Sequence, residues 1–334
     1  MRAPTVLPFG PAAVQAAAAA IRGGGIVAVP TETVYGLAAD AGNLQAVARI
    51  YAAKGRPSFN PLIVHVADLA AAEALAEFNS DASTLAEAFW PGPLTLVLPL
   101  RAGATIASLV TAGLDTVAIR VPAHRAMRAL LEAAGRPLAA PSANRSNGLS
   151  PTRAEHVVAS LGGAVPLVID DGACPAGVES TIVAGRRVLR PGPITKEQIA
   201  SILSFPGERR GPVPTSSEAG SLPSERSAAG PLRSPGKEQG MIAPGQLATH
   251  YAPSKPLRLD ADAAAPDEWL VGFGPVTGDD TLSASGDLVE AASRLFEALH
   301  RADESDRARI AVAPVPDVGI GAAINDRLRR AANR

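Results

Sequence analysis

The 334-residue sequence contains a single cysteine, Cys174, and has almost no net charge, with 31 Lys and Arg against 32 Asp and Glu. A single cysteine excludes an intrachain disulfide and a zinc site built from several cysteines. It fits a reducing compartment, so we expect the protein in the cytoplasm. A net charge of -1 lacks the basic excess of proteins that wrap nucleic acid or lie on anionic membranes, although a local cationic groove stays compatible with it.

Long apolar runs are also missing, and none reaches the roughly 20 residues that a membrane helix needs. The longest candidate is the alanine tract after Pro11, which contains Gln15 and ends in Arg22 followed by three glycines. This pattern predicts a first helix with a basic last turn and a glycine stop, and it does not match a signal peptide. We therefore expect neither a membrane span nor secretion.

Several motifs of catalysis and cofactor binding are absent. The sequence has no G-x-x-x-x-G-K-[ST] phosphate loop, and no G-x-G-x-x-G follows a predicted strand. Neither G-x-S-x-G nor H-E-x-x-H occurs, and the five histidines are scattered along the chain. A nucleophilic hydrolase and a zinc enzyme are therefore disfavoured, and we expect no metal site built from side chains. Cys174 is more readily a buried free cysteine than a nucleophile.

The composition divides the chain into three parts. Over residues 1–205, short apolar runs of strand type alternate with alanine-rich helical patterns, which predicts an α/β structure with a twisted, mixed open sheet. Over 206–255, Pro, Gly, Ser and scattered charge dominate, as in a linker. The α/β pattern resumes in 256–334, which we predict to be a smaller domain.

The expected elements follow from these patterns. Strands are predicted at 26–29, 62–66, 94–98, 117–121, 138–140, 167–169, 181–183, 187–189, 257–259, 269–273 and 310–313. Helices are predicted at 44–53, 69–77, 82–89, 126–134, 153–161 and 287–300, with a final helix that carries Arg327, Arg329 and Arg330. For these three arginines we favour a solvated helix face over contact with tRNA or a protein partner.

Polar residues gather where predicted strands end. Residues 30–37 (PTETVYGL) follow the strand at 26–29, at what we expect to be a strand-to-helix turn, where hydroxyls and backbone amides often hold anions. An N-cap formed by Thr31 or Thr33 is the alternative. Residues 54–57 (KGRP) place two cations on a Gly/Pro loop without a nearby carboxylate, which suits phosphate binding as well as a solvated helix end.

Two further polar residues interrupt apolar strands. His65 lies in LIVHV and Arg120 in VAIRVP, where a titrating or charged group is costly unless it is paired. His65 could be a core histidine with a satisfied ring, whereas Arg120 implies a carboxylate or phosphate partner from the protein or from a ligand. Polar loops follow at 141–148, 177–182 and 189–192, and each alone could be a simple turn.

Taken in series, these motifs resemble a known family. PTETVYGL, KGRP with NPLIVHV, AIRVP, PSAN, ESTI and LRPG, then HYAP after the linker, closely resemble bacterial and archaeal threonylcarbamoyl-AMP synthases. The sequence is identified as a member of the YrdC family in its long, two-domain form, since the motifs run from Pro30 to Pro253 in the family's order. The resemblance implies a YrdC-like sheet with helices, then a smaller Rossmann-like α/β domain.

The resemblance also implies a reaction. It is that of a nucleotidyltransferase, which converts L-threonine, bicarbonate and ATP into threonylcarbamoyl-AMP and pyrophosphate, the first step of N6-threonylcarbamoyladenosine formation in tRNA. A displacement at phosphorus asks the protein mainly to position reactants and neutralise charge. Mg²⁺ would enter with ATP, held largely by the phosphates and water.

The family's site residues carry over position by position. Its L-threonine pocket falls on Thr33, His65, Arg120, the backbone of Ala140, and Ser180. Its nucleotide site falls on Lys54, Arg56, Asn60, Thr116, Ser142, Asn144, Ser150, Arg190 and Tyr251. Lys54 and Arg56 are the implied catalytic pair, facing the phosphates, and the linker with Tyr251 is implied to cover the site.

Partners follow from the same resemblance, and one alternative class stays open. The implied partners are a downstream tRNA threonylcarbamoyl transferase complex and a weak contact with tRNA, with no membrane. A non-catalytic RNA-binding or ribosome-maturation module is the alternative, because YrdC-like domains have a concave cationic face. The net charge and the strand-embedded His65 and Arg120 favour a small-molecule pocket. The related carbamoyl transfer of hydrogenase maturation needs Cys-rich zinc fingers, which one cysteine excludes.

Overall fold

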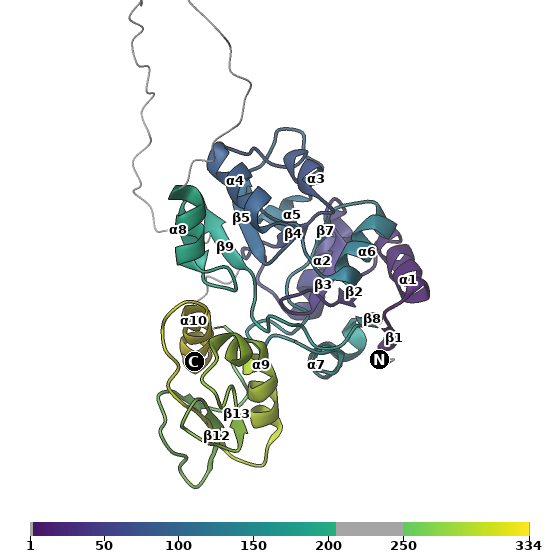
Figure 1. Ribbon diagram of the computed structural model, residues 1–334. Helices are drawn as coiled ribbons and strands as arrows, with labels where there is room; N and C mark the ends of the chain where they lie inside the picture. Colours follow the sequence, from purple (N-terminus) through teal and green to yellow (C-terminus); the bar gives the residue numbers. More distant parts are fainter. Residues whose placement is uncertain (1–2, 205–249, 334) are drawn as a thin grey trace, which may run out of the picture.

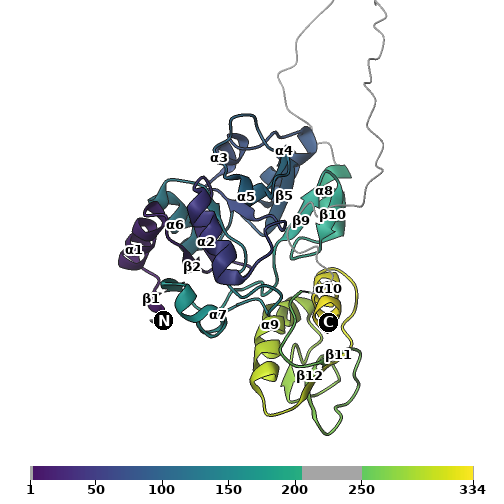
Figure 2. The ribbon, with the colours of Figure 1, turned by 180° about the vertical axis from the view of Figure 1, so that it is seen from behind.

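The fold was obtained as a computed structural model, which describes residues 3–204 and 250–333. Figures 1 and 2 show a larger α/β part formed by the first range and a smaller one formed by the second. The predicted linker, 206–255, lies outside the described residues up to 249. The limits proposed for the three parts stay a prediction.

A mixed ten-stranded sheet forms the centre of the larger part, in the order β1-β8-β2-β3-β7-β4-β6-β5-β9-β10. Its strands are β1 (Thr5–Pro8), β2 (Val27–Val29), β3 (Gly36–Asp40), β4 (Ile63–His65), β5 (Leu94–Pro99), β6 (Thr116–Arg120), β7 (Leu138–Ala139), β8 (Leu167–Asp170), β9 (Thr181–Ala184) and β10 (Arg187–Arg190). Parallel and antiparallel pairs both occur, as in β4 with β6 and β2 with β3. The predicted mixed open sheet is confirmed.

Helices cover both faces of this sheet. They are α1 (Pro11–Arg22), α2 (Leu44–Lys54), α3 (Leu69–Glu73), α4 (Ser80–Phe89), α5 (Ser108–Thr111), α6 (Arg125–Ala134), α7 (Ala154–Leu161), the 3-10 turn η1 (Gly162–Ala164) and α8 (Lys196–Ser204). Val27 and Val29 enter the core under α1 and α6, whereas Ala28 between them enters the core under α2 and α7. Successive strand residues point to opposite faces, so each face needs its own helical cover.

The capping of α2 positions two predicted site residues. Asn43 accepts hydrogen bonds from the backbone amides of Gln45 and Ala46 and starts the helix, and Gly55 ends it in the left-handed region, with a φ of 61°. Lys54 is therefore the last helical residue, and Arg56 lies directly past the stop. The sequence KGR thus places two cations on either side of a chain reversal.

The predicted strand-to-helix turn at 30–37 is wrong. Val29 pairs with Gly36, and the chain returns as β3, antiparallel to β2. The small, alanine-rich run of β3 has weak strand propensity, but all of its residues are buried between β2 and β7. Tertiary context overrides propensity here.

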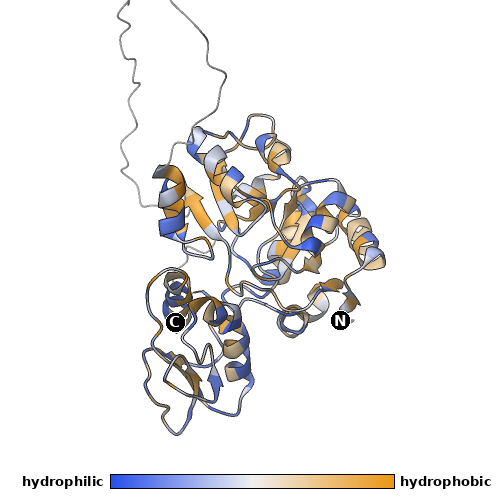
Figure 3. Ribbon diagram, viewed as in Figure 1, coloured by the Kyte–Doolittle hydropathy of each residue, from blue (hydrophilic) through white to orange (hydrophobic). Residues whose placement is uncertain are grey.

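The smaller part is an α/β domain, as predicted, and it consists of a four-stranded parallel sheet with two helices. Its strands run in the order β11-β14-β12-β13. Its elements are β11 (Leu257–Arg258), β12 (Glu268–Gly272), β13 (Asp280–Thr281), α9 (Leu288–Glu304), β14 (Arg309–Val312) and α10 (Gly321–Ala332). In Figure 3 the hydrophobic colour concentrates on strands and on inward helix faces.

The two parts share a core. Val34, Leu149 and Val178 of the larger part belong to the same hydrophobic cluster as Phe296 of α9, and Tyr251 joins them. The His156 ring of α7 stacks on the His300 ring of α9 with centroids 3.8 Å apart. The smaller part is therefore docked against the larger one, with α9 in apolar and ring contacts with it.

Several short elements escaped the sequence patterns: β1, α5, α8 and β13. β1 is an edge strand of the sheet. α5 and β13 have only 4 and 2 residues, too few to show the hydrophobic periodicity of a helix or strand. Over residues 3–204 and 250–333, no helix combines the length and apolar character that crossing a membrane requires.

Candidate active site

A cavity that is partly open to solvent lies at the carboxyl ends of β4 and β6. Parallel pairing places His65 opposite Arg120 at these ends. The wall is formed by Thr31, Thr33, Val34, Gly36, Arg56, Ile63, His65, Arg120, Ala140, Pro141, Ser142, Glu179, Ser180, Arg190, His250 and Tyr251. Nine of the predicted site residues meet in this wall: Thr33, Arg56, His65, Arg120, Ala140, Ser142, Ser180, Arg190 and Tyr251.

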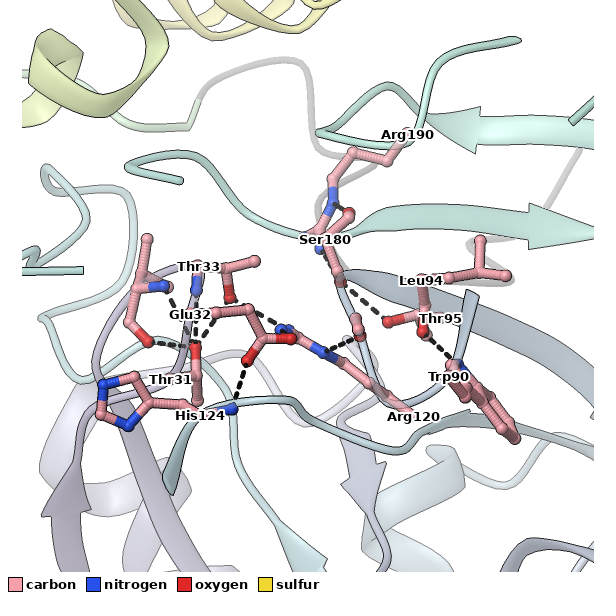
Figure 4. A network of polar contacts seen from close by, with 12 residues as sticks. Thr31, Glu32, Thr33, Trp90, Leu94, Thr95, Arg120, His124, Ser180 and Arg190 are labelled. Carbon is pink, nitrogen blue, oxygen red and sulfur yellow. Dashed lines mark hydrogen bonds and ion pairs between the residues drawn. The ribbon is translucent and has the colours of Figure 1, made fainter. Parts of the chain in front are cut away.

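Arg120, a charged residue in a buried strand, is paired with the carboxylate of Glu32. One of its nitrogens lies 2.6 Å from Glu32 Oε1, another donates to Thr33 Oγ1 at 3.0 Å, and Nε donates to the Gly92 carbonyl at 3.1 Å. Figure 4 shows Glu32 between Arg120 and the backbone amide of His124. Burial alone would raise the pKa of Glu32, but the adjacent guanidinium holds it below its usual value. The pair fixes Arg120 at the cavity wall.

The two threonines of the turn have different roles. Thr31 Oγ1 accepts from the backbone amides of Thr33 and Val34, so the capping role considered for it is real, although it caps a turn between strands. Thr33 Oγ1 instead accepts from Arg120. Both threonines line the cavity, and the Thr31 hydroxyl lies 2.8 Å from that of Thr33.

His65 is a buried, neutral imidazole. Burial lowers its pKa to about 3, and the neighbouring Arg120 adds to this effect. No described residue forms a hydrogen bond with its Nδ1 atom, and the ring lines the cavity. A ligand polar group would complete this bond.

Ser180 is held from two sides. Its hydroxyl lies 2.8 Å from Thr95 Oγ1, and Arg190 donates to its hydroxyl at 3.1 Å and to its carbonyl at 2.9 Å. Figure 4 shows Arg190 reaching Ser180 from above while Thr95 approaches from the far side. The serine that starts the hairpin of β9 and β10 is therefore rigidly placed.

Two buried cations lie in the cavity wall or behind it: Arg56 lines the wall, and Lys54 stands behind Ser142. Lys54 Nζ donates to the carbonyls of Ser142 and Asn144, each at 2.5 Å, and Arg56 donates to those of Asn60 and Pro61 at 3.1 and 2.8 Å. In the described parts of the chain, neither cation forms an ion pair with a carboxylate. Burial lowers the pKa of Arg56 to about 10, so it stays charged at neutral pH. This part of the site suits an anion.

The remaining predicted residues stand behind the wall or apart from it. Lys54 donates to the carbonyls of Ser142 and Asn144, Asn60 holds Arg56 through its carbonyl, and the Ser150 hydroxyl donates to Glu179. Thr116 lies at the start of β6, at the far end of the strand from Arg120.

Four residues of the site were missed by sequence reasoning: Glu32, Glu179, His250 and Arg327. The first three stand inside motifs already quoted, PTETVYGL, ESTI and HYAP, so the signal was present but was assigned to their neighbours. Burial lowers the pKa of His250 well below its usual value, and the cations Arg56 and Lys54 add to the effect. It is therefore neutral at the wall.

For Arg327 the prediction of a solvated helix face is wrong. Its side chain is 0% exposed and pairs with Glu179, whereas that of Arg329 is 59% exposed. The reason is tertiary, because α10 lies near the larger part in both ribbon views, and Arg327 reaches Glu179 just before β9. Two residues of spacing turn Arg329 to the opposite side of the helix.

The fold and the cavity define a class: a two-domain α/β protein with a buried site for small, anionic ligands. A family model of the Sua5, YciO and YrdC proteins, described as "Telomere recombination", matches residues 19–192. The model described as "Threonylcarbamoyl-AMP synthase, C-terminal domain" matches residues 194–333.

Individual relatives agree with these matches. The threonylcarbamoyl-AMP synthase of Bacillus subtilis is 39% identical over 340 residues, which cover 95% of this chain and 92% of that protein. The one of Pyrococcus abyssi is 37% identical over 341 residues, covering 96% and 94%. The crystal structure of P. abyssi Sua5 complexed with L-threonine matches with a TM-score of 0.80 and 35% identity, over 98% of this chain and 96% of that one. The chain belongs to the threonylcarbamoyl-AMP synthase family, in its two-domain form.

Proposed function

We propose that the protein makes threonylcarbamoyl-AMP and pyrophosphate from L-threonine, bicarbonate and ATP, and thereby serves N6-threonylcarbamoyladenosine modification of tRNA. It acts as a nucleotidyltransferase. One observation carries the assignment of the reaction to the cavity: Arg120 and a neutral His65 line the same wall as Arg56, and neither Arg56 nor the buried Lys54 has a carboxylate partner among the described residues.

The wall around Arg120 and His65, the threonine end, is proposed to bind L-threonine. The Arg120 guanidinium matches the two oxygens of an amino acid carboxylate, with Thr33 and Ser180 offering hydroxyls nearby. The Nδ1 atom of His65 has no hydrogen-bond partner among the described residues, and Ala140 lies in the same wall. The P. abyssi relative was crystallised with L-threonine, which supports this ligand.

The wall around Arg56, the ATP end, is proposed to bind ATP. The residues assigned to it are Lys54, Arg56, Asn60, Thr116, Ser142, Asn144, Ser150, Arg190 and Tyr251. The threonine nitrogen bonds to the bicarbonate carbon with loss of water, and an oxygen of the resulting carbamate then attacks the α-phosphorus. The bond from that phosphorus to the pyrophosphate oxygen breaks, and Lys54 and Arg56 offset the negative charge on the phosphates.

Mg²⁺ is proposed to accompany ATP. Among the residues that the structure describes, no three His, Cys, Asp or Glu side chains are grouped to hold a metal ion. Of the described residues that line the cavity, only Glu179 carries a carboxylate, and Ser150 and Arg327 already occupy its oxygens. This wall fits an ion bound chiefly by phosphates and water, the usual state of Mg²⁺ with nucleotides.

We place the protein in the cytoplasm, upstream of a transferase complex that moves the threonylcarbamoyl group to tRNA. A weak contact with tRNA is part of the same proposal. The alternative of a non-catalytic RNA-binding module is disfavoured by the cations themselves, because Lys54 is buried and bonded to backbone carbonyls inside the protein.

The reaction predicts a strict requirement for two co-substrates. Purified protein should release pyrophosphate from ATP only when L-threonine and bicarbonate are both present, because the carbamate is the nucleophile. Pyrophosphate release and threonylcarbamoyl-AMP should be measured together, with each substrate omitted in turn. Equal pyrophosphate release without threonine would contradict the proposed reaction.

Arg120→Lys should not behave as a conservative change. An ammonium cannot reproduce bidentate carboxylate binding, nor can it contact Glu32, Thr33 and Gly92 at once. Calorimetry should show L-threonine affinity weakened by about tenfold or more, the scale of one charge-assisted hydrogen bond, with little change for ATP. Loss of ATP binding with threonine binding intact would assign this end of the cavity to the other ligand.

A further inference from the structure

Arg327 connects the smaller part to the wall of the cavity. Its side chain is 0% exposed, which is unusual for an arginine and requires full pairing. Nε donates to Glu179 Oε2 at 2.7 Å, and another nitrogen donates to Asp326 Oδ2 at the same distance. Burial alone would lower the pKa of Arg327, but Tyr251, Glu179 and Asp326 hold it above its usual value.

Glu179 links Arg327 to the cavity. It lines the wall, and its other oxygen accepts a hydrogen bond from the Ser150 hydroxyl. Burial alone would raise the pKa of Glu179, but Arg327 and Arg190 hold it below its usual value, so both oxygens accept. Without Arg327, a buried carboxylate would lose its main counterion and would turn or take up a proton. Arg327 therefore determines where Glu179 holds Ser150.

Tyr251 is the second cavity residue that Arg327 contacts. The guanidinium carbon lies 5.2 Å from the centre of the Tyr251 ring, within the range of a cation-π contact. The ring also packs against His250 and Phe296. Tyr251 has a φ of 63°, a conformation that costs free energy for a residue with a side chain. Contacts on the ring must stabilise it there.

We propose that Arg327 is a positioning residue of the active site, supplied by the smaller domain, which orders the ATP end through Glu179, Ser150 and Tyr251. The inference rests on the proposed function for the identity of the nucleotide. It gives the smaller domain a part in the chemistry: without Arg327 of α10, the wall residues Glu179 and Tyr251 would lose a contact that holds them in place.

The threonine end should not depend on Arg327. Arg327 also donates to the Glu179 carbonyl at 3.4 Å, directly before Ser180, but the Ser180 hydroxyl itself is held by Thr95 and Arg190. Arg120 is fixed by Glu32 and Thr33. A positioning role therefore predicts a split between the two substrates, whereas a general loosening of the fold would weaken both.

The test compares two arginines of the same helix. Arg329→Met is the matched control, because Arg329 is exposed and pairs only loosely with Asp317, at 3.6 Å. In the full-length protein, Arg327→Met should raise KM for ATP by about tenfold, the scale of one hydrogen bond to a charged group. L-threonine affinity by calorimetry should stay within about twofold, and the control should match wild type in both. Circular dichroism and thermal melting check that each variant is folded.

Two further variants sharpen the result. Arg327→Lys keeps the charge but cannot reach Glu179 and Asp326 as a fork, so its KM for ATP should lie between wild type and Arg327→Met. The double variant Arg327→Met, Glu179→Gln should be no worse than Arg327→Met alone, because the two residues act as one unit. Additive losses would contradict the proposal.

Each outcome of these measurements supports or overturns the positioning role of Arg327. Unchanged KM for ATP in a folded Arg327→Met variant overturns the inference, and so does an equal loss of both substrates. If Arg327→Met does not fold, Arg327→Lys decides by the same split, and wild-type values for both substrates overturn it. If wild-type protein binds ATP but forms no threonylcarbamoyl-AMP, the proposed function fails, and ATP calorimetry on the same variants still tests the positioning role.

Discussion

Arg56→Ala is expected to lower pyrophosphate release by about a hundredfold to a thousandfold, the scale of about 2 to 4 kcal/mol for losing one preorganised charged donor. Two of its guanidinium nitrogens donate to the Asn60 and Pro61 carbonyls, which holds the charge at the cavity wall before any ligand arrives. A donor fixed in this way needs no rearrangement when charge develops on the phosphates. The readout is kcat for ATP-dependent pyrophosphate release with threonine and bicarbonate saturating.

Lys54→Ala should cause a loss of similar size for a different geometric reason. The ammonium lies behind the wall and ties together the carbonyls of Ser142 and Asn144, both assigned to the nucleotide. Its removal takes the donor of both hydrogen bonds from the site and frees the loop. Arg128→Ala, an exposed arginine on α6, is the control and should match wild type. Activity of either site variant within twofold of wild type would contradict the catalytic role.

The strand-borne polar residues were the part of the site most accessible from sequence. His65 and Arg120 each interrupt an apolar run, and a buried polar group in such a run must have a partner. The sequence could not say that the two residues meet, because β4 and β6 pair across 55 positions of chain (65 to 120), an arrangement fixed by the sheet order. Local pattern thus identified the residues, and topology supplied their contact.

The partners of these residues were less accessible. Glu32 stands in a turn motif where its neighbours Thr31 and Thr33 offered the more obvious chemistry, and its pairing with Arg120 is a contact between distant segments. The strand β3 was missed because alanine favours helices, whereas burial between two strands decides its conformation. The local sequence therefore predicts neither the pairing of Glu32 with Arg120 nor the strand pairing of β3.

Arg327 shows the same limit more sharply. An arginine on an amphipathic terminal helix is normally solvated, and Arg329 is exposed. Arg327 differs from Arg329 because α10 is docked near the larger part, where Arg327 forms an ion pair with Glu179. Only a three-dimensional arrangement of both parts separates one arginine from the other.

Tyr251→Ala is expected to reduce threonylcarbamoyl-AMP formation by about a hundredfold, the loss that a small misplacement of reactants can cause, while ATP affinity falls much less. Tyr251 is 1% exposed and lies between the cavity wall and the apolar cluster around Phe296. An acyl adenylate is prone to hydrolysis, so a site that forms one benefits from a ring that excludes water. Product formation and calorimetric ATP binding, measured on the same preparations, provide the comparison.

Tyr251→Phe separates two explanations of that loss. Phenylalanine keeps the ring that packs against His250, Phe296 and Arg327, and removes the hydroxyl. If the ring acts as a cover, Tyr251→Phe should retain most of the activity, because water is still excluded. If the phenol itself contacts the reacting groups, phenylalanine should be as damaging as alanine, and the cover explanation would then be wrong. Alanine with wild-type product formation would contradict both explanations, because a ring that neither covers nor contacts the reactants could be removed without effect.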